Sequence, residues 1–503
     1  MSDSLSADTR VLVVGAGIMG AGIAQVAALA GHRVALFDLR DGAAAAARDK
    51  LAQTLDGLAV KGKLAPDAVQ AAMARITAIG ALDEARDCGL VVEAIVENLD
   101  AKRALFQQLE ALLGEGAILA TNTSSISVTA IANGLQRPER LVGMHFFNPV
   151  PLMKLVEVVS GLRTDAAVAD AIFALSKAWG KVPVHAKSTP GFIVNRIARP
   201  YYAETLALLQ EQAAPPEVLD ACLRAAGFRM GPCELMDLIG HDTNFAVTNS
   251  VYAANFYDKR YVPSGVQREM VDGGLLGRKS GRGFYAYPAG APALPAAASA
   301  ALAADAQVVV HGVGGVADAF AAALSQPFTR AADSDWTGLE VNDAQLRLTD
   351  GATAGDLAAA TGVRDLAVFD RLPGTAWQGS LAVAVADAAS DAWRAQAPAW
   401  LALLGVQPQA VADTPGLVVA RTLAMLVNEA ADAVHQGVCS PEGADAAMKL
   451  GVNYPAGPFE WLSGWDAAGV LGILAALDDT YRGERYRASP WLLRRAQRDL
   501  IAS

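Results

Sequence analysis

Short apolar runs alternate with longer helical segments over the first third of the chain. The runs of four or five largely apolar residues lie at 10–14, 34–37, 90–94, 118–121 and 141–145. Segments with helical character lie at 21–30, 43–57 and 100–113. Strands that alternate with helices in this way predict an α/β fold with a doubly wound, mostly parallel sheet, extending to about residue 187.

A glycine-rich turn follows the first predicted strand. It reads Gly15-Ala16-Gly17-Ile18-Met19-Gly20, and a helical segment begins directly after it. In a βαβ unit these glycines allow a tight turn, a close approach of a pyrophosphate and close packing of helix on strand. Asp38 ends the second strand, where a carboxylate bonds ribose hydroxyls and repels a 2′-phosphate. The turn therefore predicts a Rossmann domain that binds NAD, although Arg40 is placed to accept the phosphate of NADP.

The hydrophobic pattern changes at Pro190-Gly191. Apolar residues then recur at helical spacing, and no strand is indicated before residue 284. Residues 288–306 are rich in Pro, Ala and Gly, as in a linker. Beyond them, apolar runs at 308–310, 366–369 and 381–385 predict a reduced α/β domain. Its Gly312-x-Gly314 lacks the third glycine of the first turn, so we do not expect it to bind a dinucleotide.

An internal repeat links the two helical parts of the chain. The segment Thr189-Pro190-Gly191-Phe192-Ile193-Val194-Asn195-Arg196 returns 225 residues later as Thr414-Pro415-Gly416-Leu417-Val418-Val419-Ala420-Arg421. This repeat predicts a duplicated helical domain. The predicted order is the NAD-binding Rossmann domain over 8–187, a helical domain over 188–287, a linker over 288–306, a reduced Rossmann-like domain over 307–408 and a second, non-catalytic helical domain over 409–503.

Composition narrows the classes of protein that fit. The 503 residues are 53% hydrophobic and 18% charged, and the formal net charge is −11. A nucleic-acid binder would carry a basic footprint, so we expect none. Four cysteines without a CxxC pair disfavour a disulfide framework or a metal site and suit a reducing compartment. A polar N-terminus and the lack of long apolar stretches predict a cytoplasmic protein with no membrane partner.

Candidate chemistry follows the later strands. His145-Phe146-Phe147-Asn148-Pro149 ends the strand at 141–145, and Glu157 lies twelve residues on from the histidine. Imidazole is suited to take a hydroxyl proton near neutral pH, and a carboxylate on its other nitrogen would orient it. A histidine at a strand end is more often structural. However, open α/β sheets bind ligands at the carboxyl ends of their strands, which favours catalysis here.

Two further segments have both a functional and a structural interpretation. The loop Thr121-Asn122-Thr123-Ser124-Ser125 can hydrogen-bond a substrate hydroxyl or carbonyl, or Ser124 or Ser125 can cap the next helix. Lys61 and Lys63 can meet ligand phosphates, or they can form an ordinary solvated helix end.

Six motifs, in order, resemble those of L-3-hydroxyacyl-CoA dehydrogenases. They are the glycine turn, Val-Val-Glu-Ala-Ile-Val-Glu-Asn at 91–98, Asn-Thr-Ser-Ser at 122–125, His-Phe-Phe-Asn-Pro at 145–149, the repeat segment at 189–196 and Gly-Arg-Lys-Ser-Gly-Arg-Gly-Phe-Tyr at 277–285. The resemblance covers residues 10–287. The duplicated tail and reduced middle domain resemble the long bacterial form, which includes 3-hydroxybutyryl-CoA and phenylacetate-pathway 3-hydroxyadipyl-CoA dehydrogenases.

The resemblance implies a reaction and the residues that perform it. NAD would accept a hydride from an (S)-3-hydroxyacyl-CoA, giving a 3-oxoacyl-CoA. His145 would be the base, Glu157 its orienting partner, and Ser124 and Asn195 would bond the substrate oxygen. Residues implied to line the cofactor are Gly15, Gly17, Ile18, Met19, Gly20, Asp38, Glu97, Lys102, Asn148 and Lys279. Residues implied to contact the acyl-CoA substrate are Thr54, Lys61 and Ser124.

The second helical copy is expected to be non-catalytic. Asn195 falls on Ala420, and no second His-Phe-Phe-Asn-Pro is present, so we expect one active site per chain. The tail copy would pack on the first as an intrachain pseudo-dimer, or the chain would form a homo-oligomer. Two other functions remain open: a non-enzymatic, crystallin-like dinucleotide binder, and a dehydrogenase of free 3-hydroxy acids.

Overall fold

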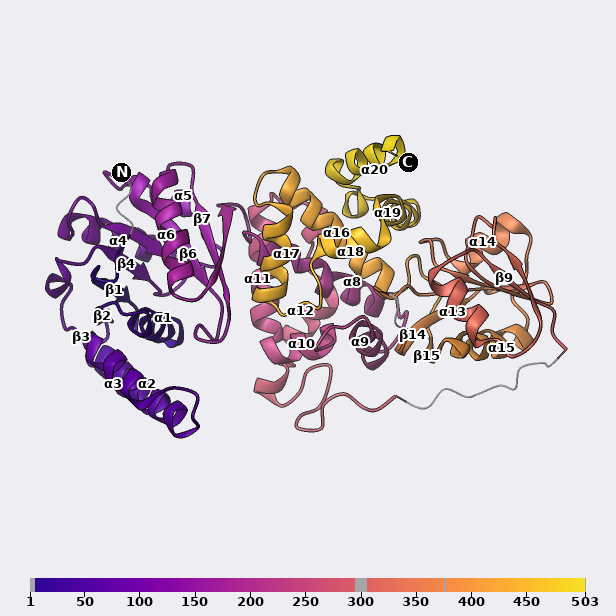
Figure 1. The fold of residues 1–503 in the computed structure, drawn as a ribbon, viewed down its shortest axis with the longest axis horizontal. Coiled ribbons are helices and arrows are strands. Elements are labelled where there is room, and N and C mark those ends of the chain that lie inside the picture. Colours follow the sequence, from indigo (N-terminus) through magenta and orange to yellow (C-terminus); the bar gives the residue numbers. More distant parts are fainter. Residues whose placement is uncertain (1–4, 295–304, 375–376, 503) are drawn as a thin grey trace. The chain divides into compact units, whose positions relative to one another are not determined.

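The computed structural model describes residues 5–294, 305–374 and 377–502. Residues 295–304 of the predicted linker lie outside these ranges. The chain forms two compact units (Figure 1). The first comprises Met1–Arg196 and Gln436–Val452, and the second comprises Ile197–His435 and Asn453–Ser503. A short piece of the second repeat copy therefore belongs to the first unit.

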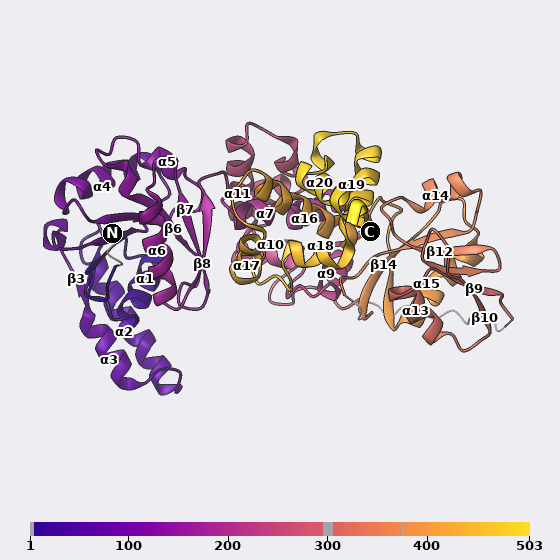
Figure 2. The same cartoon turned by 45° about the horizontal axis from the view of Figure 1, so that its top comes forward.

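The first unit is built on an eight-stranded sheet in the order β3-β2-β1-β4-β5-β6-β7-β8 (Figure 2). All neighbours are parallel except β6 and β7. The strands are β1 Val11–Val14, β2 Val34–Phe37, β3 Ile76–Ala78, β4 Leu90–Glu93, β5 Ile118–Thr121, β6 Leu141–Phe146, β7 Leu155–Ser160 and β8 Val182–Lys187. The predicted fold class is confirmed, and the sequence pattern missed β3, β7 and β8.

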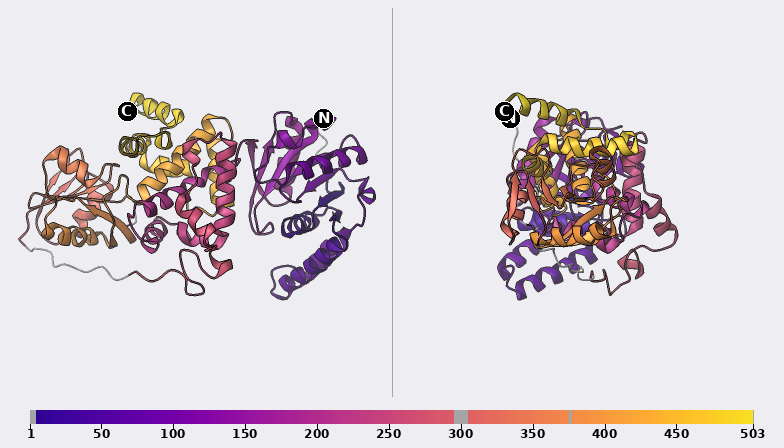
Figure 3. Two further views of the ribbon diagram at one scale, coloured as in Figure 1. Left: turned by 180° about the vertical axis from the view of Figure 1, so that it is seen from behind. Right: turned by 90° about the vertical axis from the view of Figure 1, so that its right-hand side faces the viewer.

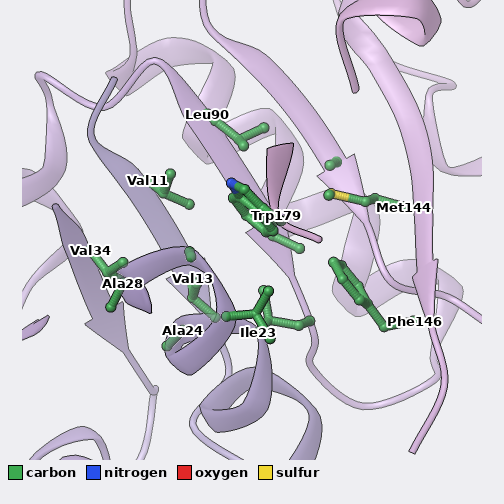
Figure 4. Close-up of a cluster of buried hydrophobic side chains, with 14 of the residues drawn as sticks. Val11, Val13, Ile23, Ala24, Ala28, Val34, Leu90, Met144, Phe146 and Trp179 are labelled. Atoms are coloured by element: carbon green, nitrogen blue, oxygen red, sulfur yellow. The ribbon is translucent and has the colours of Figure 1, made fainter. Parts of the chain in front are cut away.

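Helices connect these strands and cover the sheet. They are α1 Ile18–Leu29, α2 Ala43–Val60, α3 Pro66–Arg75, α4 Leu99–Leu112, α5 Val128–Ile131 and α6 Ala166–Ala178. On one face, Val11 and Val13 pack with Ile23 of α1 and with Trp179 at the end of α6 (Figure 4). Each such buried side chain contributes about 1.5–3 kcal/mol relative to an exposed one.

A helix from the second repeat copy completes the first unit. Helix α17, Pro441–Gly451, packs on β7 and β8. Just before it, the Val438 carbonyl accepts a hydrogen bond of 2.9 Å from Lys187 N. The repeat is therefore structurally interleaved, because the tail copy supplies part of the unit that carries the glycine turn.

The second unit holds most of both helical copies, shown from further sides in Figure 3. The helices of its first copy are α8 Arg199–Gln210, α9 Pro216–Ala225, α10 Pro232–Ile239, α11 His241–Ala254 and α12 Gly265–Asp272, and α7 Val194–Ile197 precedes them. Those of its second copy are α16 Val419–His435, α18 Pro458–Trp465, α19 Ala467–Tyr481 and α20 Pro490–Ala502. Helix α8 packs against α16, which is buried over most of its length.

Buried ion pairs repeat with the 225-residue offset between the two copies. Glu204 accepts hydrogen bonds from Arg421 at 2.7 Å and from Arg485 at 2.8 Å. Glu429, the equivalent of Glu204, accepts from Tyr261 at 2.6 Å and lies 3.4 Å from Arg260. Because charges this deeply buried must be paired to be tolerated, the equivalent carboxylates tie the two copies together.

The reduced middle domain is a seven-stranded mixed sheet in the order β10-β9-β11-β12-β13-β14-β15. Its strands are β9 Val308–His311, β10 Phe328–Ala331, β11 Gly338–Val341, β12 Ala344–Leu348, β13 Leu366–Phe369, β14 Gly379–Val385 and β15 Val406–Ala410, and its helices are α13 Gly315–Ala323, α14 Ala354–Thr361 and α15 Asp391–Leu401. The three predicted strands are confirmed, whereas β10, β11, β12 and β15 were not predicted.

Candidate active site

The glycine turn links β1 to α1, and two of its three motif glycines are required by the packing of the turn itself. A Cβ on Gly15, whose φ is +104°, would lie 2.4 Å from the Ala94 carbonyl oxygen. A Cβ on Gly20 would lie 1.7 Å from the Gly15 oxygen. At Gly17 nothing lies within 4 Å of such an atom. Gly15 and Gly20 are thus required by the fold, while Gly17 leaves space over the turn where a pyrophosphate fits.

Asp38 lies beside this turn at the end of β2. Its Oδ2 accepts from Ala16 N at 2.8 Å, and its Oδ1 accepts from Arg40 Nε at 3.0 Å. The hydrogen bond from Arg40 lowers the pKa of Asp38 to about 2, against the opposing effect of burial. The carboxylate is therefore ionised at all working pH values, and its charge disfavours a 2′-phosphate in the adjoining cavity.

Replacing Asp38 by serine is expected to shift cofactor preference toward NADP⁺. The substitution removes the repelling charge and releases Arg40, which is largely exposed, to meet a 2′-phosphate. A charge-assisted hydrogen bond contributes about 1.5–3 kcal/mol, so the ratio of kcat/KM for NAD⁺ over NADP⁺ should fall roughly 10–100-fold. Asp41→Ser, at an exposed neighbour, should leave the ratio unchanged. An unaltered ratio in Asp38→Ser would show that Asp38 does not select the cofactor.

Two cavities of the first unit share Ala94 and Ile95, just beyond β4. One, of about 840 Å³, is lined by the glycine turn, Asp38 and Arg40. The other, of about 340 Å³, is lined by twelve residues, and seven of them belong to the predicted site. These seven are Met19, Glu97, Lys102, Ser124, His145, Asn148 and Asn195. The arrangement suits an extended dinucleotide whose nicotinamide end reaches the second cavity.

Glu97 organises the loop after β5. Its Oε1 accepts from Thr123 Oγ1 at 2.7 Å and from the Ser124 and Ser125 backbone N–H groups at 2.8 and 3.1 Å. Buried Lys102 lies 3.2 Å from Glu97 and 2.6 Å from Glu93. Burial raises the pKa of Glu97, but Lys102 and these hydrogen bonds outweigh it and lower that pKa overall.

The expected helix cap at Ser124 or Ser125 is wrong. The next helix, α5, begins at Val128, and Ser127 Oγ caps it by accepting from Ala130 N at 3.2 Å. Ser124 lies three residues before this cap position and Ser125 two residues before it, and Glu97 accepts hydrogen bonds from their N–H groups instead. Ser124 lines the second cavity, and its hydroxyl donates to Glu97 Oε1 at 3.3 Å.

His145 and Glu157 face each other across the antiparallel pair β6 and β7. The register places them directly opposite, with His145 Nδ1 2.5 Å from Glu157 Oε2. Both side chains are buried, and Phe147 and Phe192 pack against the imidazole. Because Nδ1 is bonded to the carboxylate, Nε2 is the imidazole nitrogen that remains for a ligand in the second cavity.

A strained turn holds the other oxygen of Glu157. Glu157 Oε1 accepts from Ile193 N at 3.0 Å and from Val194 N at 2.9 Å. Phe192 precedes them with φ +48°, a conformation uncommon outside glycine, and Gly191 has φ +77°. The repeat segment at 189–196 therefore fixes the Glu157 carboxylate of the His145–Glu157 pair against the start of α7.

Asn195 follows on α7 and its Nδ2 donates to the Ser124 carbonyl at 3.4 Å. This contact brings together the two residues expected to bond the substrate oxygen. Thr54 lies within α2 and donates to the Lys50 carbonyl, and Lys61 lies at the exposed end of that helix. Lys279 lies in the second unit, where it pairs with Asp242. The assignments of Thr54, Lys61 and Lys279 remain predictions.

The sequence pattern did not indicate Lys181, which supports the loop that follows Asn148. This buried lysine donates through Nζ to the carbonyls of Val150 and Met153, the latter at 2.8 Å. Burial lowers the pKa of Lys181 to about 8. The lysine thus holds the segment that follows Asn148. A single lysine before a strand is common in sequences, so its sequence position did not predict this role.

The second helical copy preserves the turn, and the 225-residue offset extends back into the reduced middle domain, which lacks the imidazole. Asp370 occupies the position equivalent to His145, and Ala382 lies opposite it. The Asp370 carboxylate accepts from Val418, Val419 and Ala420 N at 2.9, 2.6 and 2.9 Å, as Glu157 does in the first copy. At these positions a single carboxylate, that of Asp370, therefore stands in place of the imidazole and carboxylate of His145 and Glu157.

Within the described ranges, neither a cluster of metal-binding side chains nor a membrane-spanning helix is present. Those ranges contain no group of three or more His, Cys, Asp or Glu side chains that could hold a metal ion. None of their helices has both the length and the apolar character needed to cross a membrane.

Family models match nearly the whole chain. The model described as 3-hydroxyacyl-CoA dehydrogenase, NAD binding domain, matches residues 10–189. The C-terminal domain model of the same family matches twice, at 191–287 and 416–501. Residues 346–415 match the 3-hydroxybutyryl-CoA dehydrogenase reduced Rossmann-fold domain. The double match confirms the predicted duplication.

Individual relatives agree with these matches. The chain is 43% identical to 3-hydroxyadipyl-CoA dehydrogenase of Escherichia coli K12 over 97% of both chains. It is 41% identical to a probable 3-hydroxybutyryl-CoA dehydrogenase of Bacillus subtilis, over 55% of this chain and 97% of the relative. A crystal structure of 3-hydroxybutyryl-CoA dehydrogenase from E. coli K12 matches with a TM-score of 0.90 at 41% identity, covering 99% of this chain and all of that one.

Proposed function

The chain belongs to the 3-hydroxyacyl-CoA dehydrogenase family, and from this premise we propose that its substrate is an acyl-CoA with a distal carboxylate, 3-hydroxyadipyl-CoA. The family assignment makes it an NAD-dependent oxidoreductase of 3-hydroxyacyl-CoA thioesters. The two alternatives, a crystallin-like binder and a dehydrogenase of free 3-hydroxy acids, are thereby set aside. The choice of acyl group is supported by a relative that matches over 97% of both chains and carries that name.

The proposed chemistry rests on the His145–Glu157 pair. Bound NAD⁺ supplies the hydride acceptor. Neutral His145 takes the proton of the 3-hydroxyl through Nε2 as the C3–H bond breaks. Glu157, fixed by two backbone N–H groups, keeps the imidazole oriented and stabilises the imidazolium that forms. The reverse reduction uses the protonated imidazole as the acid.

Ser124 and Asn195 are proposed to position the substrate oxygen. Both line the cavity that His145 faces, and Glu97 holds the Ser124 backbone in place. Thr54 and Lys61 on α2 are proposed to contact the CoA moiety, with the lysine meeting a phosphate as a point charge.

The test of the acyl group is kcat/KM across 3-hydroxybutyryl-, 3-hydroxyhexanoyl- and 3-hydroxyadipyl-CoA, followed by NADH absorbance. We expect the highest value for 3-hydroxyadipyl-CoA. A higher value for the four-carbon substrate would overturn this choice while leaving the dehydrogenase assignment intact.

One NADH site per chain is expected in equilibrium titration. Asp370 and Ala382 of the reduced middle domain stand in place of the proposed catalytic pair, and the Gly312-x-Gly314 turn of that domain lacks the third glycine. Titration of the full chain with NADH, followed by fluorescence, should saturate at one equivalent. Two equivalents would show that the reduced domain also binds the dinucleotide.

We also propose that the two helical copies form an intrachain pseudo-dimer. Helix α8 packs against α16, and the Glu204 and Glu429 clusters repeat across that contact. A molar mass near 52.1 kDa in solution is expected. A mass of two chains at assay concentration would contradict this state.

A further inference from the structure

The tail copy contributes one helix to the unit that carries the proposed catalytic pair. Helix α17 belongs to the second helical copy and packs on β7 and β8. Before this helix, the Val438 carbonyl accepts a hydrogen bond of 2.9 Å from Lys187 N, and Gln436 Oε1 accepts one of 2.8 Å from Arg196 Nη1. The tail copy is therefore anchored at the end of β8 and at the residue that follows Asn195.

The same kind of contact recurs in the second unit, with the two copies exchanged. Helix α9 of the first copy packs on β14 of the reduced domain. With the 225-residue offset, Ala412 corresponds to Lys187 and Ala213 to Val438. Ala412 N donates to the Ala213 carbonyl at 2.8 Å, as Lys187 N does to the Val438 carbonyl. The helix of each copy therefore covers the sheet that precedes the other copy in the chain.

Gly451, the last residue of α17, is buried close to the proposed catalytic pair. A Cβ on this glycine would lie 2.7 Å from Leu155 Cδ2, 3.0 Å from Val194 Cγ2 and 3.6 Å from Phe147 Cε1. Leu155 begins β7, and the Val194 N–H group donates to Glu157. Leu155 and Val194 are themselves buried, so a side chain at the end of α17 would displace its neighbours around the pair.

Phe147 connects this glycine to the proposed base. The centre of its ring lies 4.5 Å from that of the His145 ring, at an interplanar angle of 51°. Phe147 also lines the second cavity, together with His145. A larger residue in place of Gly451 would therefore press on the phenylalanine ring and, through it, on the imidazole.

The equivalent positions of the second unit carry side chains of different size. With the 225-residue offset, Ala226 corresponds to Gly451 and Leu372 to Phe147, and both are buried. The reduced domain has no imidazole at the position of the proposed base. The helix position therefore accepts a methyl group beside a sheet that has no base, whereas glycine occurs where the sheet presents a phenylalanine ring. In a close-packed interior, the space that one side chain gains is given up by its neighbour.

We infer that Gly451 of the non-catalytic copy is a positioning residue for His145 and acts through the Phe147 ring. The inference rests on the proposed function, in which His145 is the base. The tail copy then has a part in turnover, because α17 forms the wall behind Phe147 and keeps the imidazole where it meets the 3-hydroxyl. Since proton and hydride transfer need aligned reacting atoms, a displacement of about 1 Å can lower the rate about 100-fold.

The experiment measures single-turnover NADH formation by the full chain, with the 3-hydroxyacyl-CoA that the wild type oxidises fastest. At saturating enzyme, the rate constant does not depend on the fraction of chains that are folded, so a merely structural role would leave it unchanged. Gly451→Val is expected to lower this rate constant about 10–100-fold. Ala226→Val is the matched control, because it places the same side chain at the equivalent position of the first copy. It should keep the wild-type rate constant.

The outcomes separate the inference from the proposed function. A wild-type rate constant in Gly451→Val, or an equal fall in Ala226→Val, would overturn the inference and leave a working dehydrogenase. Absence of NADH formation by the wild type with every 3-hydroxyacyl-CoA would instead refute the proposed function. Thermal unfolding monitors the folding of the variants. If Gly451→Val does not fold, Gly451→Ala tests the same position with the smallest side chain: a several-fold lower rate constant supports the inference, and an unchanged one overturns it.

Discussion

His145→Ala is expected to lower kcat about 10²–10⁴-fold while NADH still binds. The substitution removes the group proposed to take the hydroxyl proton, and general base catalysis contributes a factor of this size. The glycine turn and Asp38 lie apart from the imidazole and are left intact. Steady-state turnover with a 3-hydroxyacyl-CoA and NADH titration measure the two effects separately.

The matched control is His185→Ala. His185 lies in β8 of the same unit with its side chain about half exposed, so its loss should change turnover little. Turnover near the wild-type value in His145→Ala would eliminate the proposed base. Equal loss of NADH affinity and turnover would point to a collapsed site rather than to a missing base.

Glu157→Gln is expected to reduce kcat by up to about 10⁴-fold, the effect of turning a triad carboxylate into an amide. Both carboxylate oxygens are used: one bonds His145 Nδ1, and the other accepts two backbone N–H groups. A glutamine has one acceptor oxygen. If the amide oxygen faces His145, the amide N–H group faces the two backbone N–H donors. If the amide is turned the other way, its N–H group faces the imidazole, which has lost its charged partner.

The same substitution should also destabilise the protein. An unsatisfied buried donor costs about 1–3 kcal/mol, so the unfolding transition should move to lower temperature. Glu115→Gln, at a largely exposed glutamate paired with Arg137, is the control for both measurements. If Glu157→Gln unfolds like wild type and retains its kcat, the pair is structural only.

The sequence predicted this pair because a hairpin makes it local. Twelve residues separate His145 from Glu157, and β6 and β7 run antiparallel with these residues in register. The strand β7 was nevertheless not predicted. It is buried on both faces and contains Glu157, so it shows no alternation of polar and apolar residues.

Other parts of the site depend on contacts between distant segments. Lys181 reaches two carbonyls about thirty residues earlier, and Glu97 binds a loop almost thirty residues later. Helix α17 returns from the far end of the chain to cover β7 and β8. Such contacts carry no periodic signal. The glycine turn, in contrast, could be predicted from the sequence, because local steric contacts dictate its residue types at Gly15 and Gly20.

The central claim is that the site built on His145 and Glu157 oxidises a CoA thioester at C3 with NAD⁺. The most direct measurement is NADH formation by the purified full chain with (S)-3-hydroxyadipyl-CoA and, in parallel, with free 3-hydroxyadipate. Saturable NADH formation with the thioester, with little or none from the free acid, is the predicted result. Comparable rates with both compounds, or no NADH from the thioester, would contradict the account.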